Sequence, residues 1–159
     1  MLIDILTIFP EMFSGPLDYS LLKRAREKNL LQLGFHNIRD FAEDKHQTVD
    51  DTPFGGLGGM VMKLEPLCKA LESILNRGQD ESEPSIILTT PQGERFSQDK
   101  AKELSLKDHL VFICGHYKGV DERLKTLYPL EELSIGDYVL TGGEMPAMVV
   151  IEAVVRLIP

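Results

Sequence analysis

Short apolar runs alternate along the chain with segments of helical periodicity, and this alternation limits the fold more than any other feature of the sequence. The runs are continuously apolar, as expected of strands that are buried on both faces of a parallel sheet. We expect strands at residues 2–9, 30–35, 85–88 and 110–114, and helices at residues 19–28, 64–75, 97–104, 121–127 and 145–158. Strands that alternate with helices predict an α/β fold with a mostly parallel sheet flanked by helices.

The composition favours a single domain. With 159 residues, 43% of them hydrophobic, the chain is long enough to enclose one core. No stretch approaches the roughly 18 apolar residues of a membrane span, and the N-terminus lacks the features of a signal peptide. We therefore expect a cytoplasmic protein that does not enter a membrane. Cys68 and Cys114 fall in a predicted helix and at a predicted strand end, and we expect both to be reduced.

The formal net charge of -8 argues against a chain that grips nucleic acid through a broad basic surface. Lys23, Arg24, Arg26 and Lys28 cluster on one predicted helix, where a solvated face explains them more simply than a phosphate contact. The histidines and cysteines show no metal-ligand spacing, so the sequence predicts no metal site.

Three segments carry glycines, at residues 89–93, 115–119 and 135–143, and the first two directly follow predicted strands. Ligands of parallel sheets bind outside the carboxyl ends of the strands. Residues 135–140 suit an extended segment, and Gly142 and Gly143 would let a ligand approach bare backbone. Together the three segments predict a pocket whose backbone groups read an uncharged or zwitterionic ligand, while ordinary turns are the alternative for each segment taken alone.

Residues 39–54 are too polar for a core and too long for an ordinary connection, so we expect a functional or mobile loop. The glycine run at residues 55–59 lacks the sequence patterns of phosphate-binding loops, and we interpret it as a lid hinge. Residues 79–83 read as an acidic surface linker. Asp50 and Asp51 offer a carboxylate for proton transfer, although a solvated acidic pair is the commoner explanation.

The last predicted helix, residues 145–158, is apolar nearly all round and must be buried on more than one side. A subunit interface or an enclosed position would satisfy it. Glu152 and Arg156 interrupt it at a spacing that favours an ion pair. A guanidinium presented into a site is the other interpretation of Arg156, and the composition does not choose between them.

Ordered motifs are spread over the whole chain, at residues 8–13, 39–41, 44–46, 48–51, 91–93, 114–115, 121–123, 134–148 and 156–159. With these motifs the chain resembles the N-terminal domain of the bacterial tRNA (guanine-N1)-methyltransferase family, in the SPOUT class of knotted methyltransferases. The resemblance implies a deep trefoil knot near the C-terminal end, against the general rule that connections do not thread loops. It also implies a homodimer with each site at the interface.

By motif match, the resemblance implies that the three glycine-bearing segments hold S-adenosylmethionine. The implied cofactor-binding residues are Thr89, Thr90, Pro91, Gly93, Gly115, Ile135, Gly136, Asp137, Tyr138, Val139, Leu140, Gly142 and Gly143.

The implied reaction moves a methyl group from this cofactor to N1 of the guanine on the 3' side of the anticodon in tRNA. The resemblance gives Arg156 the role of stabilising charge on the purine oxygen and places Asp50 as a carboxylate near the site. It places the general base, an aspartate, beyond the last residue, Pro159. We therefore expect residues 1–159 to be a cofactor-binding domain without the tRNA-binding C-terminal domain, able to dimerise but weakly active or inactive. The resemblance also implies Mg²⁺ for activity.

Two positions depart from the family pattern. His116 stands where the family usually has arginine, and Lys118 where it has an acid, which reverses the charge at that point. No catalytic role is carried over to Lys118. The alternatives to the implied function are a non-enzymatic α/β nucleotide-binding module and a knotted methyltransferase that acts on a different RNA base.

Overall fold

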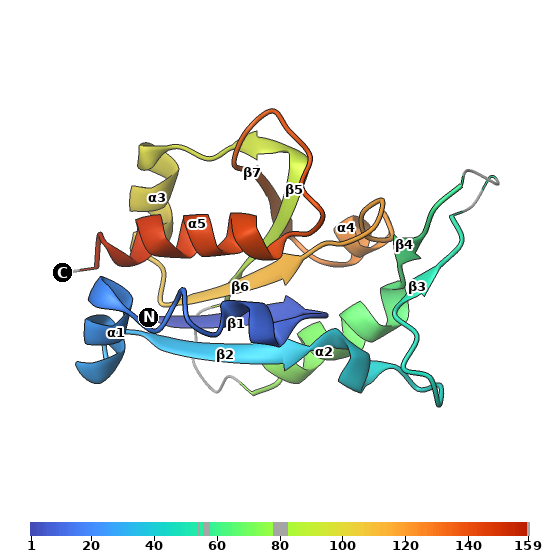
Figure 1. Ribbon diagram of the computed structural model, residues 1–159, viewed down its shortest axis with the longest axis horizontal. Coiled ribbons are helices and arrows are strands. Elements are labelled where there is room, and N and C mark those ends of the chain that lie inside the picture. Colours follow the sequence, from blue (N-terminus) through green and yellow to red (C-terminus); the bar gives the residue numbers. More distant parts are fainter. Residues whose placement is uncertain (54, 56–57, 78–82, 159) are drawn as a thin grey trace.

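A five-stranded, all-parallel sheet forms the centre of the molecule in the computed structural model, which describes residues 1–53, 55, 58–77 and 83–158 (Figure 1). The strand order is β2-β1-β6-β5-β7. The strands are β1 (Leu2–Thr7), β2 (Gln32–Asn37), β5 (Ser85–Arg95), β6 (His109–Cys114) and β7 (Leu130–Ser134). The predicted α/β fold with a parallel sheet is confirmed, whereas the trefoil knot stays a prediction.

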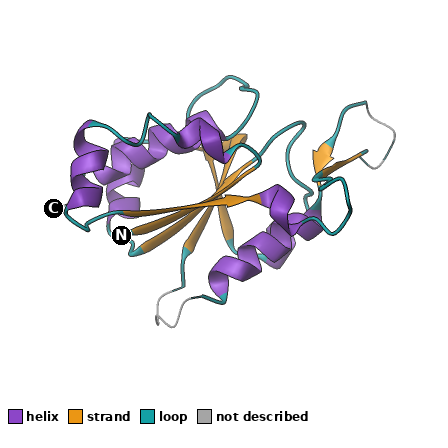
Figure 2. Cartoon of the chain, turned by 60° about the horizontal axis from the view of Figure 1, so that its bottom comes forward, coloured by secondary structure: helices purple, strands orange, loops and turns teal. Residues whose placement is uncertain are grey.

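Helices cover both faces of the sheet (Figure 2). One face packs against η1 (Pro10–Phe13), α1 (Ser20–Glu27), α3 (Gln98–Ser105) and α5 (Glu144–Val155). The other packs against η2 (Ile38–Phe41), α2 (Leu64–Leu75) and α4 (Leu124–Leu127). Neighbouring side chains of a strand point to opposite faces, so Ile5 enters the first core and Leu6 the second. This two-sided burial explains the continuously apolar runs.

The strand β7 was not predicted, because two acidic residues occupy its centre. Glu131 and Glu132 are half-buried on this edge strand and pair with lysines outside it: Glu131 lies 2.6 Å from the Lys100 Nζ and Glu132 lies 2.9 Å from the Lys125 Nζ. The predicted extended segment at residues 135–140 is wrong, since the strand ends at Ser134 and the chain then bends.

The strand β5 continues past the predicted end at residue 88 to Arg95. Its pairing with β7 shifts register between Thr89 and Glu94, which is a bulge within the strand. The first glycine-bearing segment is therefore an irregularity inside a strand, and not a loop that follows one.

The long polar segment contains more structure than a mobile loop would. The strands β3 (Asp50–Asp51) and β4 (Val61–Met62) pair antiparallel, and Val49 and Met62 are buried in the second core. The Met62 N–H donates to the Gly119 carbonyl at 3.0 Å, which ties this pair to the main body. Residues 54 and 56–57 of the expected loop and hinge, and 79–82 of the expected linker, lie outside the described residues.

Several helix ends follow their local signals. The Ser97 hydroxyl accepts from the Lys100 N–H at 3.2 Å and caps α3. Asn29 has a φ of 57° and ends α1 in the left-handed region. No side chain caps the start of α1, and the nearby Asp18 carboxylate accepts from the Gly15 N–H at 3.0 Å and from Arg26.

The cysteines are free, as predicted, with Cys114 buried in β6 and Cys68 half-buried in α2. Burial raises the pKa of both thiols, and most strongly that of Cys114, which also lies near the charge of Glu144. None of the helices in the described ranges is long and apolar enough to cross a membrane.

Candidate functional site

A cavity of about 440 Å³ opens at the carboxyl ends of β6 and β7 and beside the bulge in β5. Three chain segments form most of its wall, and they are the three glycine-bearing segments of the sequence. The predicted cofactor-binding residues that line the cavity are Thr89, Thr90, Pro91, Gly115, Ile135, Gly136, Tyr138, Val139, Leu140, Gly142 and Gly143. A position at strand ends is where the topology of parallel sheets places ligand sites.

Two of the predicted cofactor-binding residues do not line the cavity. A Cβ at Gly93 would collide with the backbone of Glu132 and Leu133, so this glycine allows β5 and β7 to approach each other. Asp137 is exposed on the bend after β7 and does not contribute to the wall.

Hydrogen bonds join the three segments to one another. The Gly143 N–H donates to the Gly115 carbonyl at 2.8 Å. The buried Thr89 hydroxyl lies 3.2 Å from both the Ile113 and the Gly143 carbonyl oxygens. The wall is therefore one connected structure in which β5, β6 and the start of α5 hold one another in place.

Gly143 is required for this close approach. A Cβ at this position would fall within 3.0 Å of the Thr89 Oγ1, and 2.8 Å from both the Cys114 Cα and the Gly115 N. Its φ of -83° suits any residue, so packing alone demands glycine here.

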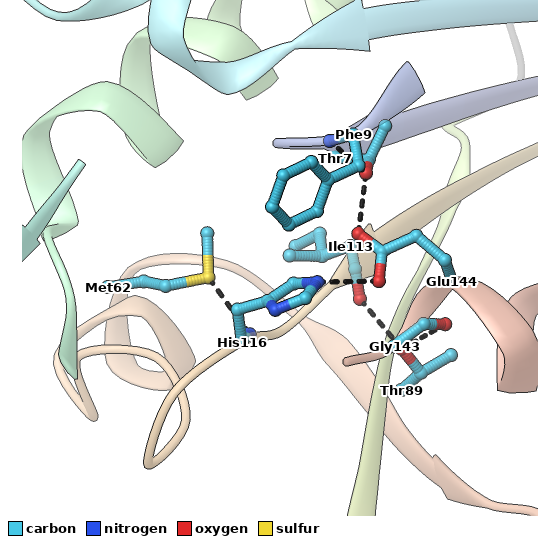
Figure 3. Close-up of polar contacts among 8 residues, drawn as sticks. All are labelled: Thr7, Phe9, Met62, Thr89, Ile113, His116, Gly143 and Glu144. Carbon is cyan, nitrogen blue, oxygen red and sulfur yellow. Dashed lines mark hydrogen bonds and ion pairs between the residues drawn. The ribbon is translucent and has the colours of Figure 1, made fainter. Parts of the chain in front are cut away.

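A buried polar chain lies behind the wall (Figure 3). Glu144, only 1% exposed, is the first residue of α5. Its Oε1 accepts from the Thr7 hydroxyl at 2.6 Å, and its Oε2 lies 2.7 Å from the Nε2 of His116, which lines the cavity. Neither Thr7 nor Glu144 was predicted, because residues so far apart in the chain give no local signal.

Charged side chains also reach the wall. Lys118 lines the cavity and makes no salt bridge within the described residues. Lys125 lies 2.9 Å from carboxylate oxygens of both Glu122 and Glu132, and these hydrogen bonds raise the pKa of Lys125. The wall thus offers backbone groups, apolar side chains and a mixed set of charges.

Other residues of the wall were outside the predicted set. They are Leu88, Gln92, His116, Tyr117, Lys118, Gly119, Val120, Glu122, Lys125, Glu132, Leu133, Ser134, Thr141 and Pro146. Six of them lie inside the glycine-bearing segments, so the sequence pattern could have predicted them: Gln92, His116, Tyr117, Lys118, Gly119 and Thr141. Glu122, Lys125 and Glu132 carry no local signal, since α4 and β7 bring them to the cavity.

The two predicted catalytic residues do not line the cavity of this single chain. Arg156 is exposed at the end of α5, and the ion pair with Glu152 suggested by the spacing is not among the salt bridges of the described residues. Asp50 is half-buried in β3. Within the described ranges, no group of three or more histidine, cysteine or acidic side chains could hold a metal ion.

Comparison with known proteins shows close relatives. The chain is 58% identical over 157 residues to the tRNA (guanine-N(1)-)-methyltransferase of Dictyoglomus turgidum, covering 99% of this chain and 62% of the relative. It is 55% identical over 159 residues to that of Carboxydothermus hydrogenoformans, covering 100% of this chain and 61% of the relative. The chain thus spans about three fifths of the length of these curated relatives.

A solved structure and a family model agree with these relatives. The crystal structure of a tRNA (m1G37) methyltransferase from Aquifex aeolicus matches with a TM-score of 0.89 and 38% identity, covering 100% of this chain and 70% of that one. The family model described as tRNA (Guanine-1)-methyltransferase TrmD matches residues 1–159. The chain therefore belongs to the tRNA (guanine-1)-methyltransferase family.

Proposed function

We propose that this chain binds S-adenosylmethionine in the cavity formed by its glycine-bearing segments, as the catalytic part of a tRNA (guanine-N1)-methyltransferase. The observation that carries the proposal is the cavity at the carboxyl ends of the parallel strands, built by residues 89–92, 115–119, 135–136 and 138–143, in a chain of this family.

The residues present suit this cofactor. Small-molecule sites enclose roughly 300–1,000 Å³ and are mostly apolar with a few placed polar groups, and the cavity of about 440 Å³ fits that description. Ile135, Val139 and Leu140 offer apolar surface for a purine, and the backbone of the glycine-bearing segments offers hydrogen-bonding groups for its edge. When bound, the cofactor supplies an electrophilic methyl group.

The proposed reaction also needs a base for the N1 proton of guanine and a donor for its oxygen. We propose that Arg156 is that donor and that Asp50 lies near the substrate. Since neither residue lines the cavity of its own chain, we infer that a second copy of the chain completes each site.

The outward side of α5 supports a homodimer. Met145 and Val149 lie one turn apart on this helix and are 54% and 46% exposed, and Arg156 continues the same stripe at helical spacing. An apolar stripe that ends in a guanidinium could pack against a second copy and bring Arg156 to the partner's cavity. A shift of the chain from dimer to monomer on Val149→Glu, measured by sedimentation, would support this arrangement, and an unchanged mass would refute it.

The cofactor proposal is tested by calorimetry with S-adenosylmethionine and its demethylated product, S-adenosylhomocysteine. We expect the chain to bind both. Tyr138 and Tyr19 are exposed by 54% and 70%, and only Tyr138 lines the cavity, so they form a matched pair. Tyr138→Ala should weaken binding about ten-fold, or 1.4 kcal/mol, while Tyr19→Ala should bind as the unchanged chain does. Absence of binding to either ligand would overturn the proposal.

The reaction is tested with a tritiated methyl donor and tRNA transcripts, with and without Mg²⁺. We propose that tight tRNA binding uses part of the additional length of the relatives, so the chain is compared with the full-length Carboxydothermus hydrogenoformans relative. We expect transfer by the relative to a transcript with guanine 3' of the anticodon, and weak transfer by the chain. Equal methylation of a transcript lacking that guanine would indicate another target base, and no transfer by the relative would favour a non-enzymatic module.

A further inference from the structure

The buried carboxylate at the start of α5 has no role in the proposed reaction, although its surroundings are fully organised. Glu144 Oε1 accepts from the Thr7 hydroxyl at 2.6 Å, and the Thr7 oxygen in turn accepts from the Phe9 N–H at 2.9 Å. The Thr7 hydroxyl therefore donates its one hydrogen to the Glu144 Oε1. The other carboxylate oxygen, Oε2, contacts His116. A carboxylate buried to this degree is maintained only where hydrogen bonds replace its hydration.

Glu144 is the first residue of a twelve-residue helix, and both oxygens of its carboxylate have hydrogen-bond partners. An ionised carboxylate only accepts hydrogen bonds, so the contact of 2.7 Å requires the hydrogen to lie on the His116 Nε2. Glu144 thus selects the tautomer of a histidine that lines the cavity.

The rest of the surroundings hold the same ring in place. The Phe9 ring meets the His116 ring edge-on with centroids 5.2 Å apart. The backbone N–H of His116 donates to the Met62 Sδ at 3.2 Å, which fixes the backbone that carries the ring. A Cβ at Gly142 would fall within 3.0 Å of both the His116 ring and the Glu144 carboxylate, so a glycine is needed for the pair to form. Figure 3 shows this cluster, with His116 reaching from the end of β6 to the start of α5.

We propose that Glu144 is a positioning residue: it fixes His116 as the Nε2–H tautomer and so holds residues 115–119 in the shape that the cofactor requires. The inference rests on the proposed function for the identity of the ligand, but the order of this segment can be measured without any ligand. Since residues 115–119 form one side of the cavity, loss of the contact should loosen that side.

The test compares Glu144→Gln with Glu152→Gln, because Glu152 is an exposed glutamate of the same helix. A glutamine that still accepts from Thr7 turns its amide N–H toward His116, which opposes the Nε2–H tautomer. Nitrogen-15 NMR of the histidine side chains, with His116 assigned from the His116→Gln spectrum, should show the Nε2–H form in the unchanged chain. It should show loss of that form in Glu144→Gln only.

Two further readouts separate positioning from general stability. Hydrogen exchange of the amides of residues 115–119, without ligand, should be at least ten-fold faster in Glu144→Gln and unchanged in Glu152→Gln. The dissociation constant for S-adenosylhomocysteine should rise about ten-fold in Glu144→Gln.

The outcomes decide the inference in each case. Unchanged exchange at residues 115–119 in Glu144→Gln, or an Nδ1–H tautomer in the unchanged chain, would overturn it. If the unchanged chain does not bind the ligand, the proposed function fails, and the exchange data still decide the positioning role. If Glu144→Gln does not fold, the tautomer of His116 in the unchanged chain still decides the inference, because the contact with the Glu144 Oε2 requires the Nε2–H form.

Discussion

Gly143→Ala tests the close approach on which the cavity depends. The backbone angles of Gly143, φ -83° and ψ -4°, are open to alanine, so the substitution introduces no conformational strain. The added Cβ would nevertheless lie 2.8 Å from both the Cys114 Cα and the Gly115 N, and still nearer to the Thr89 Oγ1. The threonine side chain could rotate away, whereas the two backbone atoms can move only with β6.

The expected cost follows from these contacts. Overpacking a tight site costs about 1–3 kcal/mol. Moving α5 away from β6 also weakens the hydrogen bond of 2.8 Å between the Gly143 N–H and the Gly115 carbonyl, at about 0.5–1.5 kcal/mol. Alanine also lowers the conformational entropy of the unfolded chain, which stabilises the fold by about 0.4–1 kcal/mol and partly offsets these costs. We therefore expect the free energy of unfolding to fall by about 2–3 kcal/mol.

Urea unfolding followed by circular dichroism measures this loss, and two glycines provide controls. A Cβ at Gly115 would find its nearest atoms at 3.7–3.9 Å, which is ordinary contact, and a Cβ at Gly58 would meet nothing within 4 Å. Neither residue has a positive φ, so both alanine variants should unfold within about 0.5 kcal/mol of the unchanged chain. A Gly143→Ala chain as stable as Gly115→Ala would refute the steric reasoning.

Two further predictions concern ionisable groups. Burial opposes ionisation of Asp4, but hydrogen bonds and charges from His109 (2.8 Å) and His36 (2.6 Å) outweigh it and hold the pKa of this carboxyl well below its usual range. The charged Asp4 side chain stabilises the folded chain above the unfolded pKa of about 3.9, and this stabilisation is lost as the pH falls toward the lowered folded pKa. The difference in the free energy of unfolding between the unchanged chain and Asp4→Asn should therefore narrow by about 1 kcal/mol from pH 7 to pH 3. Urea titrations at both pH values measure the gap, and an equal gap would contradict the prediction. Alkylation of the native chain near neutral pH should modify Cys68 before Cys114, because burial raises the pKa of the Cys114 thiol more strongly; mass spectrometry showing the reverse order would contradict this.

The sheet was predictable because its central strands obey a local rule. Strands β1 and β6 are buried on both faces and therefore read as apolar runs. The strand β7 was not predicted because its acidic residues are accommodated by ion pairs with Lys100 and Lys125. These lysines lie outside the strand, and no local pattern indicates that they are its partners. The long β5 escaped because Pro91 and Gly93, which normally end strands, occupy its bulge.

For the apolar helix at the C-terminal end, the sequence pattern predicted burial but not which part of the molecule buries it. Its composition required burial on more than one side, and Ala147, Val150 and Val154 are indeed fully buried. The pattern left open whether a subunit interface or an enclosed position accounts for the burial, and the single chain already encloses most of α5. Met145 and Val149 form a smaller exposed stripe, which the single chain does not bury.

The glycines of the site show what a sequence leaves undecided. A glycine in a sequence can indicate a place where a Cβ would collide with a neighbouring atom. It does not indicate which atom that is. At Gly93 that atom belongs to the backbone of β7, at Gly142 to the pair formed by His116 and Glu144, and at Gly143 to β5 and β6. The same residue type thus serves strand packing, a buried hydrogen bond and the junction of the cavity wall. The glycines of the sequence thus indicate the cavity, but Gly93 does not line it. Only the packed structure distinguishes a backbone that leaves room for a ligand from one that leaves room for another strand.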